Sequence, residues 1–309
     1  MAPRYATVAE LRRAISTEIL VAAGVPRRGP LQTVLSPLVW PPADRFAHLA
    51  AEFDRRVALD GWTAAVRWVL PRFVDGTHAH GSANVPATGP LVVASNHPGS
   101  YDSLVIASAL ARDDLKILVS DVPFLRNLHA TSSHFIYTPN DPHSRLMAFR
   151  ESVRHLRAGG ALLVFATGVV DPDPALRSTS SFAVLPDAQE ALQRWSPSLA
   201  LFLRAVPEAG LLPTIVSGVL APSCLRHPLT RLRQGQQQKQ FLAEFLQVTQ
   251  QLLFSRRFGL RPTVRFGTLL TVAALDGGHD AQAIPRSWRP PSCAVAAIIQ
   301  QAQLLLAQV

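Results

Sequence analysis

Beyond residue 90 the sequence alternates between short apolar runs and longer stretches with helical periodicity. Residues 91–94, 115–119 and 161–165 are mostly apolar and include β-branched side chains, which is typical of buried strands. Residues 144–158 repeat apolar positions at spacings of three and four, which favours an amphipathic helix. Strands that alternate with helices predict an α/β domain with a mixed, largely parallel sheet flanked by helices.

The alternation continues to the C-terminus. Pro213 has no N–H for a sheet ladder, so the apolar run around it is expected to begin a strand or to lie at an edge. The buried face of the helix at 144–158 is expected to carry Leu146, Phe149, Val153 and Leu156, and that of a glutamine-rich helix at 236–258 to carry Phe241, Phe245 and Leu252. We also predict helices at 103–112 and 294–309, and strands at 134–137, 211–220 and 263–266.

The first 75 residues differ from the rest in having a helical pattern alone. Helices are expected around residues 11–18, 46–59 and 62–69, with five prolines separating the first two. Residues 76–90 form a connector, so we predict a helical subdomain at 1–75 and an α/β domain at 76–309. The helices either pack plainly on the main domain or contact a membrane or an acyl chain, and the sequence leaves both readings open.

The composition narrows the classes of partner. The chain of 309 residues has a net charge of +9 and is 48% hydrophobic, a combination that attracts anionic lipid surfaces, nucleic acid or phosphate-bearing molecules. No nucleic-acid-binding motif is evident, so no nucleic-acid partner is expected. No run supplies the roughly 18 apolar residues of a membrane-spanning helix, and no leader peptide is evident. We therefore expect a cytoplasmic protein, peripheral at an anionic membrane surface.

The residues that commonly bind metals give no such signal. The two cysteines, Cys224 and Cys293, are far apart and form no metal-binding or disulfide framework. His78 and His80 are the only close histidine pair, and without acidic or cysteine neighbours we interpret them as part of a loop. No metal site is predicted.

The segment at 91–102, LVVASNHPGSYD, carries the most informative polar residues. The strand ends before His97, a turn follows, and Asp102 begins the next helix near a serine cap at Ser100. Such a turn can bring the two side chains together, giving an imidazole with one nitrogen held by a carboxylate and the other free. The alternative is a surface histidine and an aspartate that serves only the helix N-terminus.

The string Asn-His-Pro-Gly-Ser-x-Asp resembles the first motif block of the glycerolipid and lysophospholipid acyltransferase superfamily, whose signature is a His followed after four residues by an Asp. Later segments resemble the other three blocks in order: residues 135–138 (FIYT), 165–170 (FATGVV) and 211–216 (LLPTIV). The resemblance covers about residues 76–309. It implies that His97 deprotonates an acceptor hydroxyl and that Asp102 orients it.

The second and third blocks depart from the family pattern. Thr138 stands where an arginine is usual, and Thr167 and Val170 stand where a glutamate and an arginine are usual. A hydroxyl or an alkyl group does not replace a guanidinium that binds phosphate. Either Arg145 or Arg177 substitutes, or the acceptor is not a simple glycerol phosphate. With Thr138 and Thr167, these arginines are the candidate substrate-binding residues, and the Gly168 N–H is a candidate donor to the reaction's oxyanion.

The resemblance implies an O-acyltransferase that uses an acyl thioester, either acyl-CoA or acyl carrier protein, as co-substrate with no bound cofactor. The acceptor is a lysophospholipid or glycerolipid hydroxyl. The intact His97 and Asp102 favour this enzyme. The changed second and third blocks favour the alternative, a catalytically weak relative that binds lipids or acyl chains.

Overall fold

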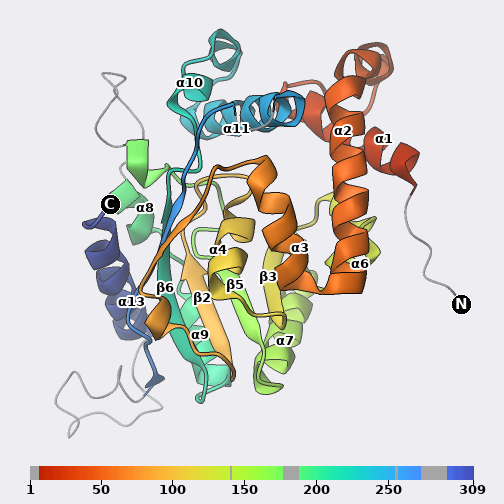
Figure 1. Ribbon diagram of the computed structural model, residues 1–309. Helices are drawn as coiled ribbons and strands as arrows, with labels where there is room; N and C mark the ends of the chain where they lie inside the picture. Colours follow the sequence, from red (N-terminus) through yellow and green to blue (C-terminus); the bar gives the residue numbers. More distant parts are fainter. Residues whose placement is uncertain (1–6, 140, 177–187, 255–256, 273–290) are drawn as a thin grey trace, which may run out of the picture.

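The computed structural model describes residues 7–139, 141–176, 188–254, 257–272 and 291–309. Its centre is a seven-stranded sheet in the order β1-β7-β6-β2-β5-β3-β4 (Figure 1). The strands are β1 His78–His80, β2 Leu91–Ser95, β3 Leu115–Ser120, β4 Phe135–Thr138, β5 Ala161–Phe165, β6 Gly210–Ser217 and β7 Thr263–Phe266.

Five adjacent strands, from β6 to β4, run parallel, and β7 pairs antiparallel with β6. β1 completes the sheet by pairing parallel with β7. The predicted mixed, largely parallel α/β fold is therefore confirmed. β2, between β5 and β6, has all five residues buried, as its uniformly apolar sequence requires.

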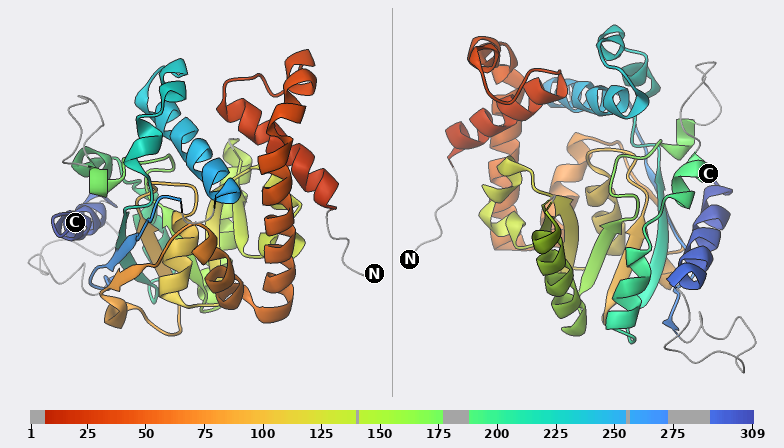
Figure 2. Two further views of the ribbon diagram at one scale, coloured as in Figure 1. Left: turned by 45° about the horizontal axis from the view of Figure 1, so that its top comes forward. Right: turned by 180° about the vertical axis from the view of Figure 1, so that it is seen from behind.

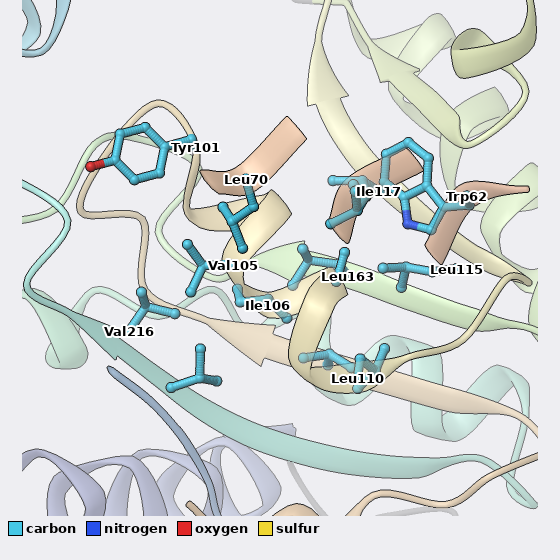
Figure 3. Packing of buried hydrophobic residues seen from close by; sticks show 14 of the residues in the cluster. Trp62, Leu70, Tyr101, Val105, Ile106, Leu110, Leu115, Ile117, Leu163 and Val216 are labelled. Atoms are coloured by element: carbon cyan, nitrogen blue, oxygen red, sulfur yellow. The ribbon is translucent and has the colours of Figure 1, made fainter. Parts of the chain in front are cut away.

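Helices cover both faces of the sheet (Figures 1 and 2). On one face α3 and α4 pack on the odd-numbered residues of β2, in a cluster that includes Trp62, Val105 and Leu163 (Figure 3). On the other face α7, α8, α9 and α13 pack on Val92 and Ala94. The bounds are α3 Trp62–Val69, α4 Asp102–Leu110, α7 Pro142–Arg157, α8 Ala188–Gln193, α9 Ser198–Ala205 and α13 Pro291–Leu306.

The N-terminal region forms two long helices, α1 Val8–Ala22 and α2 Pro30–Asp60. The predicted break across the proline-rich segment is wrong for most of it, because Pro37, Pro41 and Pro42 all lie inside α2. An interior proline costs a helix about 3 kcal/mol, and here the buried face of α2, packed on α1, offsets that cost. Ala43, Ala47 and Ala50 provide this face.

Two further strand predictions need correction. His78–His80 is not loop but the edge strand β1, paired with residues 263–265 of β7. Pro213 lies neither at the start nor at an edge, because β6 has a neighbour on each side. The Pro213 carbonyl accepts from the Gly267 N–H where the regular β6–β7 pairing has stopped, so the missing proline N–H faces an interrupted ladder.

Two predicted helix faces are also wrong in part. In α7, Pro142–Arg157, Val153 and Leu156 are buried as expected, but Leu146 is exposed. In α11, Gln236–Leu253, the buried residues include Leu242 and Ala243 as well as the polar Gln240, Glu244, Gln247 and Gln251. Their hydrogen bonds to the loops beneath stabilise this polar face inside the protein.

The boundary predicted at residue 75 remains a prediction. Phe53 and Val57 of α2 belong to the same hydrophobic cluster as the sheet residues. None of the helices in the described part of the chain is both long and apolar enough to cross a membrane. The short helices not yet mentioned are α5 Pro123–Arg126, α6 His129–Ser132 and α10 Pro222–Leu225.

Candidate active site

The topology brings the ends of the parallel strands together at one edge of the sheet. β2 leads to His97, β5 leads to Thr167, and β4 ends at Thr138. Because the carboxyl ends of parallel strands share an edge, residues far apart in the sequence meet there, and open α/β sheets bind ligands at this edge. Helix α11 lies across this end of the molecule (Figure 1).

His97 and Asp102 are in direct contact, as the sequence predicts. His97 Nδ1 lies 2.8 Å from Asp102 Oδ2, and the carboxyl is 1% exposed while the imidazole is 27% exposed. The imidazole also stacks on the Phe165 ring, with centroids 4.2 Å apart. Within the described residues no hydrogen bond reaches His97 Nε2. The ring is therefore oriented on one side and free on the other.

The turn that joins the pair is fixed by its other residues. The Asn96 side chain extends the pairing of β2 with β6: its Oδ1 accepts the Val216 N–H, and its Nδ2 donates to the Val216 carbonyl. Gly99 donates its N–H to Asp102 Oδ2, and a Cβ at this position would lie 2.9 Å from the Val219 side chain. Only glycine therefore fits without a shift in its neighbour.

The predicted serine cap is wrong. Tyr101 occupies the N-cap position of α4 without a side-chain cap bond, and Ser100 points its hydroxyl elsewhere, to Glu244. Asp102 itself accepts the N–H of Gly99, three residues before it, and so supports the turn together with the imidazole.

Two aspartates in the loop after β5, Asp171 and Asp173, also stabilise this region. The Asp171 carboxylate accepts the backbone N–H of His97 at 2.9 Å. The Asp173 carboxylate accepts the N–H groups of Gly218, Val219 and Leu220, at the end of β6. The loop that follows β5 is thus tied both to the His97 turn and to β6.

These elements surround a cavity of about 850 Å³, a size typical of small-molecule and cofactor sites. His97 and Phe165 line it where the sheet ends, and apolar side chains of α1, α2 and α11 form part of the remaining wall. Among the latter are Phe241, Phe245, Val248, Ile19, Phe46 and Phe53. Phe245, which we expected to pack inward, thus faces the cavity.

The cavity also contains most of the predicted substrate-binding residues. Thr138, Arg145, Thr167 and Gly168 all line it. The Thr138 hydroxyl already donates to the Val119 carbonyl, and the Thr167 hydroxyl to the Val169 carbonyl. Arg177 lies outside the described residues.

Gly168 and Arg145 differ in whether their hydrogen-bond donors are available to a ligand. Gly168 adopts φ +69°, and its N–H donates to the Phe165 carbonyl, which argues against the predicted oxyanion role in this conformation. The exposed Arg145 guanidinium makes no hydrogen bond or ion pair with any described residue. Arg145 therefore has a guanidinium in the cavity wall that is available to bind an anion.

The electrostatics of the site are dominated by buried carboxyl groups. Burial alone lowers the His97 pKa, but the charge and hydrogen bond of Asp102 outweigh it, with smaller contributions from Glu244 and Asp171, and raise that pKa to about 9. Burial raises the pKa of Asp171, although the hydrogen bond from the His97 N–H opposes this. His97 therefore retains its proton more strongly than a free histidine does.

The sequence interpretation missed the residues of α11 that hold the site. Gln240 donates to the carbonyls of Pro98 and Asp171, and Gln247 donates to the Tyr101 hydroxyl and the Val219 carbonyl. With Glu244 and Gln251 they recur at spacings of three and four, which is the period of one helix face. That periodicity was readable in the sequence, but the apolar residues on the neighbouring face gave the stronger hydrophobic signal.

Comparisons with known proteins support the resemblance. Residues 76–191 match the family model described as Acyltransferase. This segment includes His97, Asp102 and Asp171. No curated protein sequence matches the chain. A solved structure, the 1-acyl-sn-glycerophosphate (LPA) acyltransferase PlsC from Thermotoga maritima, is similar at 12% identity and a TM-score of 0.42, over 94% of this chain and 88% of that chain. The segment at 76–191, which carries the His97–Asp102 pair, belongs to the acyltransferase family.

Proposed function

We propose that the protein transfers a fatty acyl group from an acyl thioester to a hydroxyl of a lysophospholipid-type acceptor. The observation that carries this proposal is the 2.8 Å contact between His97 and Asp102 at the wall of a large, mostly apolar cavity. A positioned imidazole supplies general-base catalysis, and an apolar cavity takes the acyl chain.

The chemistry follows from the orientation of the imidazole. Asp102 holds Nδ1, so Nε2 takes the proton from the acceptor hydroxyl as its oxygen attacks the thioester carbonyl. The C–S bond of the resulting tetrahedral intermediate breaks, and the leaving thiolate accepts the proton from Nε2. An ester and a free thiol are the products, and His97 returns to its starting form without a bound cofactor.

The acceptor is expected to carry an anionic head and an apolar tail. Arg145 offers a guanidinium with no protein partner in the described residues, and a guanidinium recognises phosphate through a fork of donors. The apolar walls formed by α1, α2 and α11 favour acceptors that also bury hydrocarbon. A lysophospholipid meets both conditions, and glycerol-3-phosphate, which has no tail, meets only the first.

The direct test is to incubate the purified protein with an acyl-CoA and lysophosphatidic acid while measuring release of free thiol. His97→Ala should lower turnover by on the order of 10²–10⁴, the usual contribution of a general base. The exposed His48, paired with Asp44 on α2, supplies the matched control, and His48→Ala should retain the activity. Equal thiol release by the wild type and His97→Ala would remove His97 from the reaction.

A lipid- or acyl-binding protein without turnover is the second candidate. The observation that favours it is the engagement of the Thr138 and Thr167 hydroxyls by local backbone, where the family pattern supplies charged residues. Equilibrium binding of acyl-CoA without thiol release, over the same panel of lysolipids, would select this function over acyl transfer.

We also propose that the protein binds reversibly to anionic membranes through the first half of α2. Leu31, Val34 and Leu38 follow one another at spacings of three and four and are 56%, 69% and 74% exposed. The exposed Arg28 lies just before the helix. An exposed apolar stripe beside basic residues is typical of a segment that inserts at the surface of a bilayer.

The membrane proposal is tested by flotation with anionic liposomes. Association should weaken as salt rises, because exposed charges are screened, and Leu38→Asp should weaken it at every salt concentration. Leu59 is similarly exposed but lies at the opposite end of α2, so Leu59→Asp is the control that should leave flotation unchanged. Equal flotation of both variants would contradict the assignment of this surface.

A further inference from the structure

One face of α11 is polar and buried, and it contacts the turn that carries the catalytic pair. Gln240 donates to the Pro98 carbonyl, and Gln247 donates to the Tyr101 hydroxyl. Between them, Glu244 accepts a 2.8 Å hydrogen bond from the Ser100 hydroxyl. Three residues of the turn between His97 and Asp102 are thus held by a helix that lies outside the segment matched by the acyltransferase family.

Glu244 differs from the glutamines in carrying an ionisable group. It is 4% exposed and lines the same cavity as His97. The charged groups that shift the pKa of Glu244 are His97 and Asp102. Its hydrogen-bond donor, the Ser100 hydroxyl, is neutral. A buried carboxylate is costly without a cationic partner, so Glu244 is either protonated or balanced by a proton on His97.

The other charged groups around the cavity do not supply that cation. Glu18 of α1 pairs with Arg27, which does not line the cavity. Arg145 of α7 does line the cavity, but it makes no ion pair with Glu244 and is not among the groups that shift its pKa. His97 itself interacts with the charges of Asp102, Glu244 and Asp171. Three carboxyl groups from different parts of the chain therefore act together to hold the proton on the imidazole.

We propose that Glu244 is a positioning residue that acts through His97: its negative charge, when present, holds a proton on the imidazole and delays formation of the base. This inference rests on the proposed role of His97 as general base. Asp102 is hydrogen-bonded to the ring and orients it, whereas Glu244 is hydrogen-bonded to Ser100 in the turn. Its charge therefore changes the protonation of His97 without changing the ring's orientation.

The direction of the effect follows from the two protonation equilibria. Burial raises the pKa of Glu244 to about 8, below the value of about 9 for His97. As the pH rises, Glu244 loses its proton first, and its new charge strengthens the hold of His97 on the remaining proton. Removing the carboxyl group should then allow His97 to become a base at lower pH.

The experiment is an NMR titration of isotopically labelled histidines in the full chain, with His97 assigned by comparison with His97→Gln. Glu244→Gln keeps the size of the side chain and an acceptor for Ser100. It should lower the titration midpoint of His97 by about one pH unit, the usual effect of a nearby charge. In the thiol-release assay the variant should be more active only above about pH 8, where Glu244 of the wild type is ionised. At pH 7, where Glu244 is protonated, the variant and the wild type should have similar activity.

Gln251→Leu is the control for damage to the buried polar face of α11. Gln251 lies about two turns after Glu244 on this helix, and the substitution removes its hydrogen bond to the Phe73 carbonyl. It should reduce stability and leave the His97 midpoint in place. Ser100→Ala is a second variant in case Glu244→Gln does not fold. It removes a bond that favours ionised Glu244, so it should also lower the His97 midpoint, by less.

The results separate this inference from the proposed function. An unchanged His97 midpoint in a folded Glu244→Gln protein would overturn the inference and leave the base role of His97 intact. A lowered midpoint supports it, even if no substrate is turned over. A purely structural role predicts a different result in the assay, since Glu244→Gln would then lose activity at pH 7, where removal of the charge alone has no effect.

Discussion

The backbone of His97 is held twice by Asp171: the Asp171 carboxylate accepts the His97 N–H at 2.9 Å, and the Asp171 N–H donates to the His97 carbonyl at 2.8 Å. Asp171 follows the segment that diverges most from the acyltransferase pattern. In that segment Thr167 and Val170 stand where the family pattern has a glutamate and an arginine. Asp171, the residue that follows, fixes the backbone from which the imidazole projects.

Removing this support should loosen the turn. Asp171→Ala leaves the buried His97 N–H without its acceptor, which should lower the free energy of unfolding by about 1–3 kcal/mol. Denaturant titration measures that loss, and turnover should fall with it because the imidazole is less well oriented. Asp171→Asn keeps an acceptor oxygen and should lose less on both measures. An equal loss in the two variants would mean that the charge of Asp171, and not its hydrogen bond, supports the site.

Asp102→Asn should reduce acyl transfer by on the order of 10²–10⁴, because an amide neither fixes the ring's tautomer nor stabilises the imidazolium. The same change should lower the His97 pKa, since Asp102 is the main group that raises it. Histidine NMR and thiol release measure the two effects separately. A variant with the lower His97 pKa and near-normal turnover would show that orientation by Asp102 contributes little.

Activity is expected to rise with pH. The base form of His97 exists only above its pKa, so kcat/KM should increase about tenfold per pH unit below pH 9 and level off above it. The profile should be recorded with an acceptor whose own ionisation does not change over that range. A plateau reached near pH 6.5, the ordinary value for histidine, would mean that the surrounding carboxyl groups are neutral in the working enzyme.

The sequence predicted those features that depend on neighbouring residues or on regular periodicity. The strand at 91–95, the turn after it and the meeting of His97 with Asp102 are all local, because five residues separate the pair. The polar face of α11 was missed because its partners, such as Pro98 and Tyr101, lie about 140 residues away. A glutamine looks like a surface residue until the carbonyl that accepts its hydrogen bond is placed beside it.

The same reasoning explains the errors at prolines. Pro213 and the interior prolines of α2 each break a local rule, and each is tolerated because of a tertiary arrangement. An interrupted ladder removes the need for the Pro213 N–H, and packing on α1 stabilises α2. Neither arrangement can be derived from the residues on either side of the proline.

Arg145→Gln should raise the KM for lysophosphatidic acid by about ten- to hundredfold, since a hydrogen bond to a charged group contributes about 1.5–3 kcal/mol. The effect on an uncharged monoacylglycerol should be small. Arg150, an exposed arginine on the same helix that does not line the cavity, supplies the control Arg150→Gln. Equal losses with charged and uncharged acceptors would show that Arg145 supports the cavity without reading the phosphate.

Replacing Val248 with tryptophan should shorten the acyl chains that the protein prefers. Val248 lies on the side of α11 that lines the cavity, so the larger ring occupies space that the chain would otherwise fill. Exclusion of two methylene groups from apolar surroundings costs about 1.6 kcal/mol, which is roughly a tenfold loss with the longest chains. Thiol release measured over a series of acyl-CoA lengths should therefore show a maximum at shorter chains. Gln238→Trp adds the same ring to an exposed position of α11 and should leave the preference unchanged. If both variants keep the wild-type chain-length profile, the acyl chain binds elsewhere than along this face of α11.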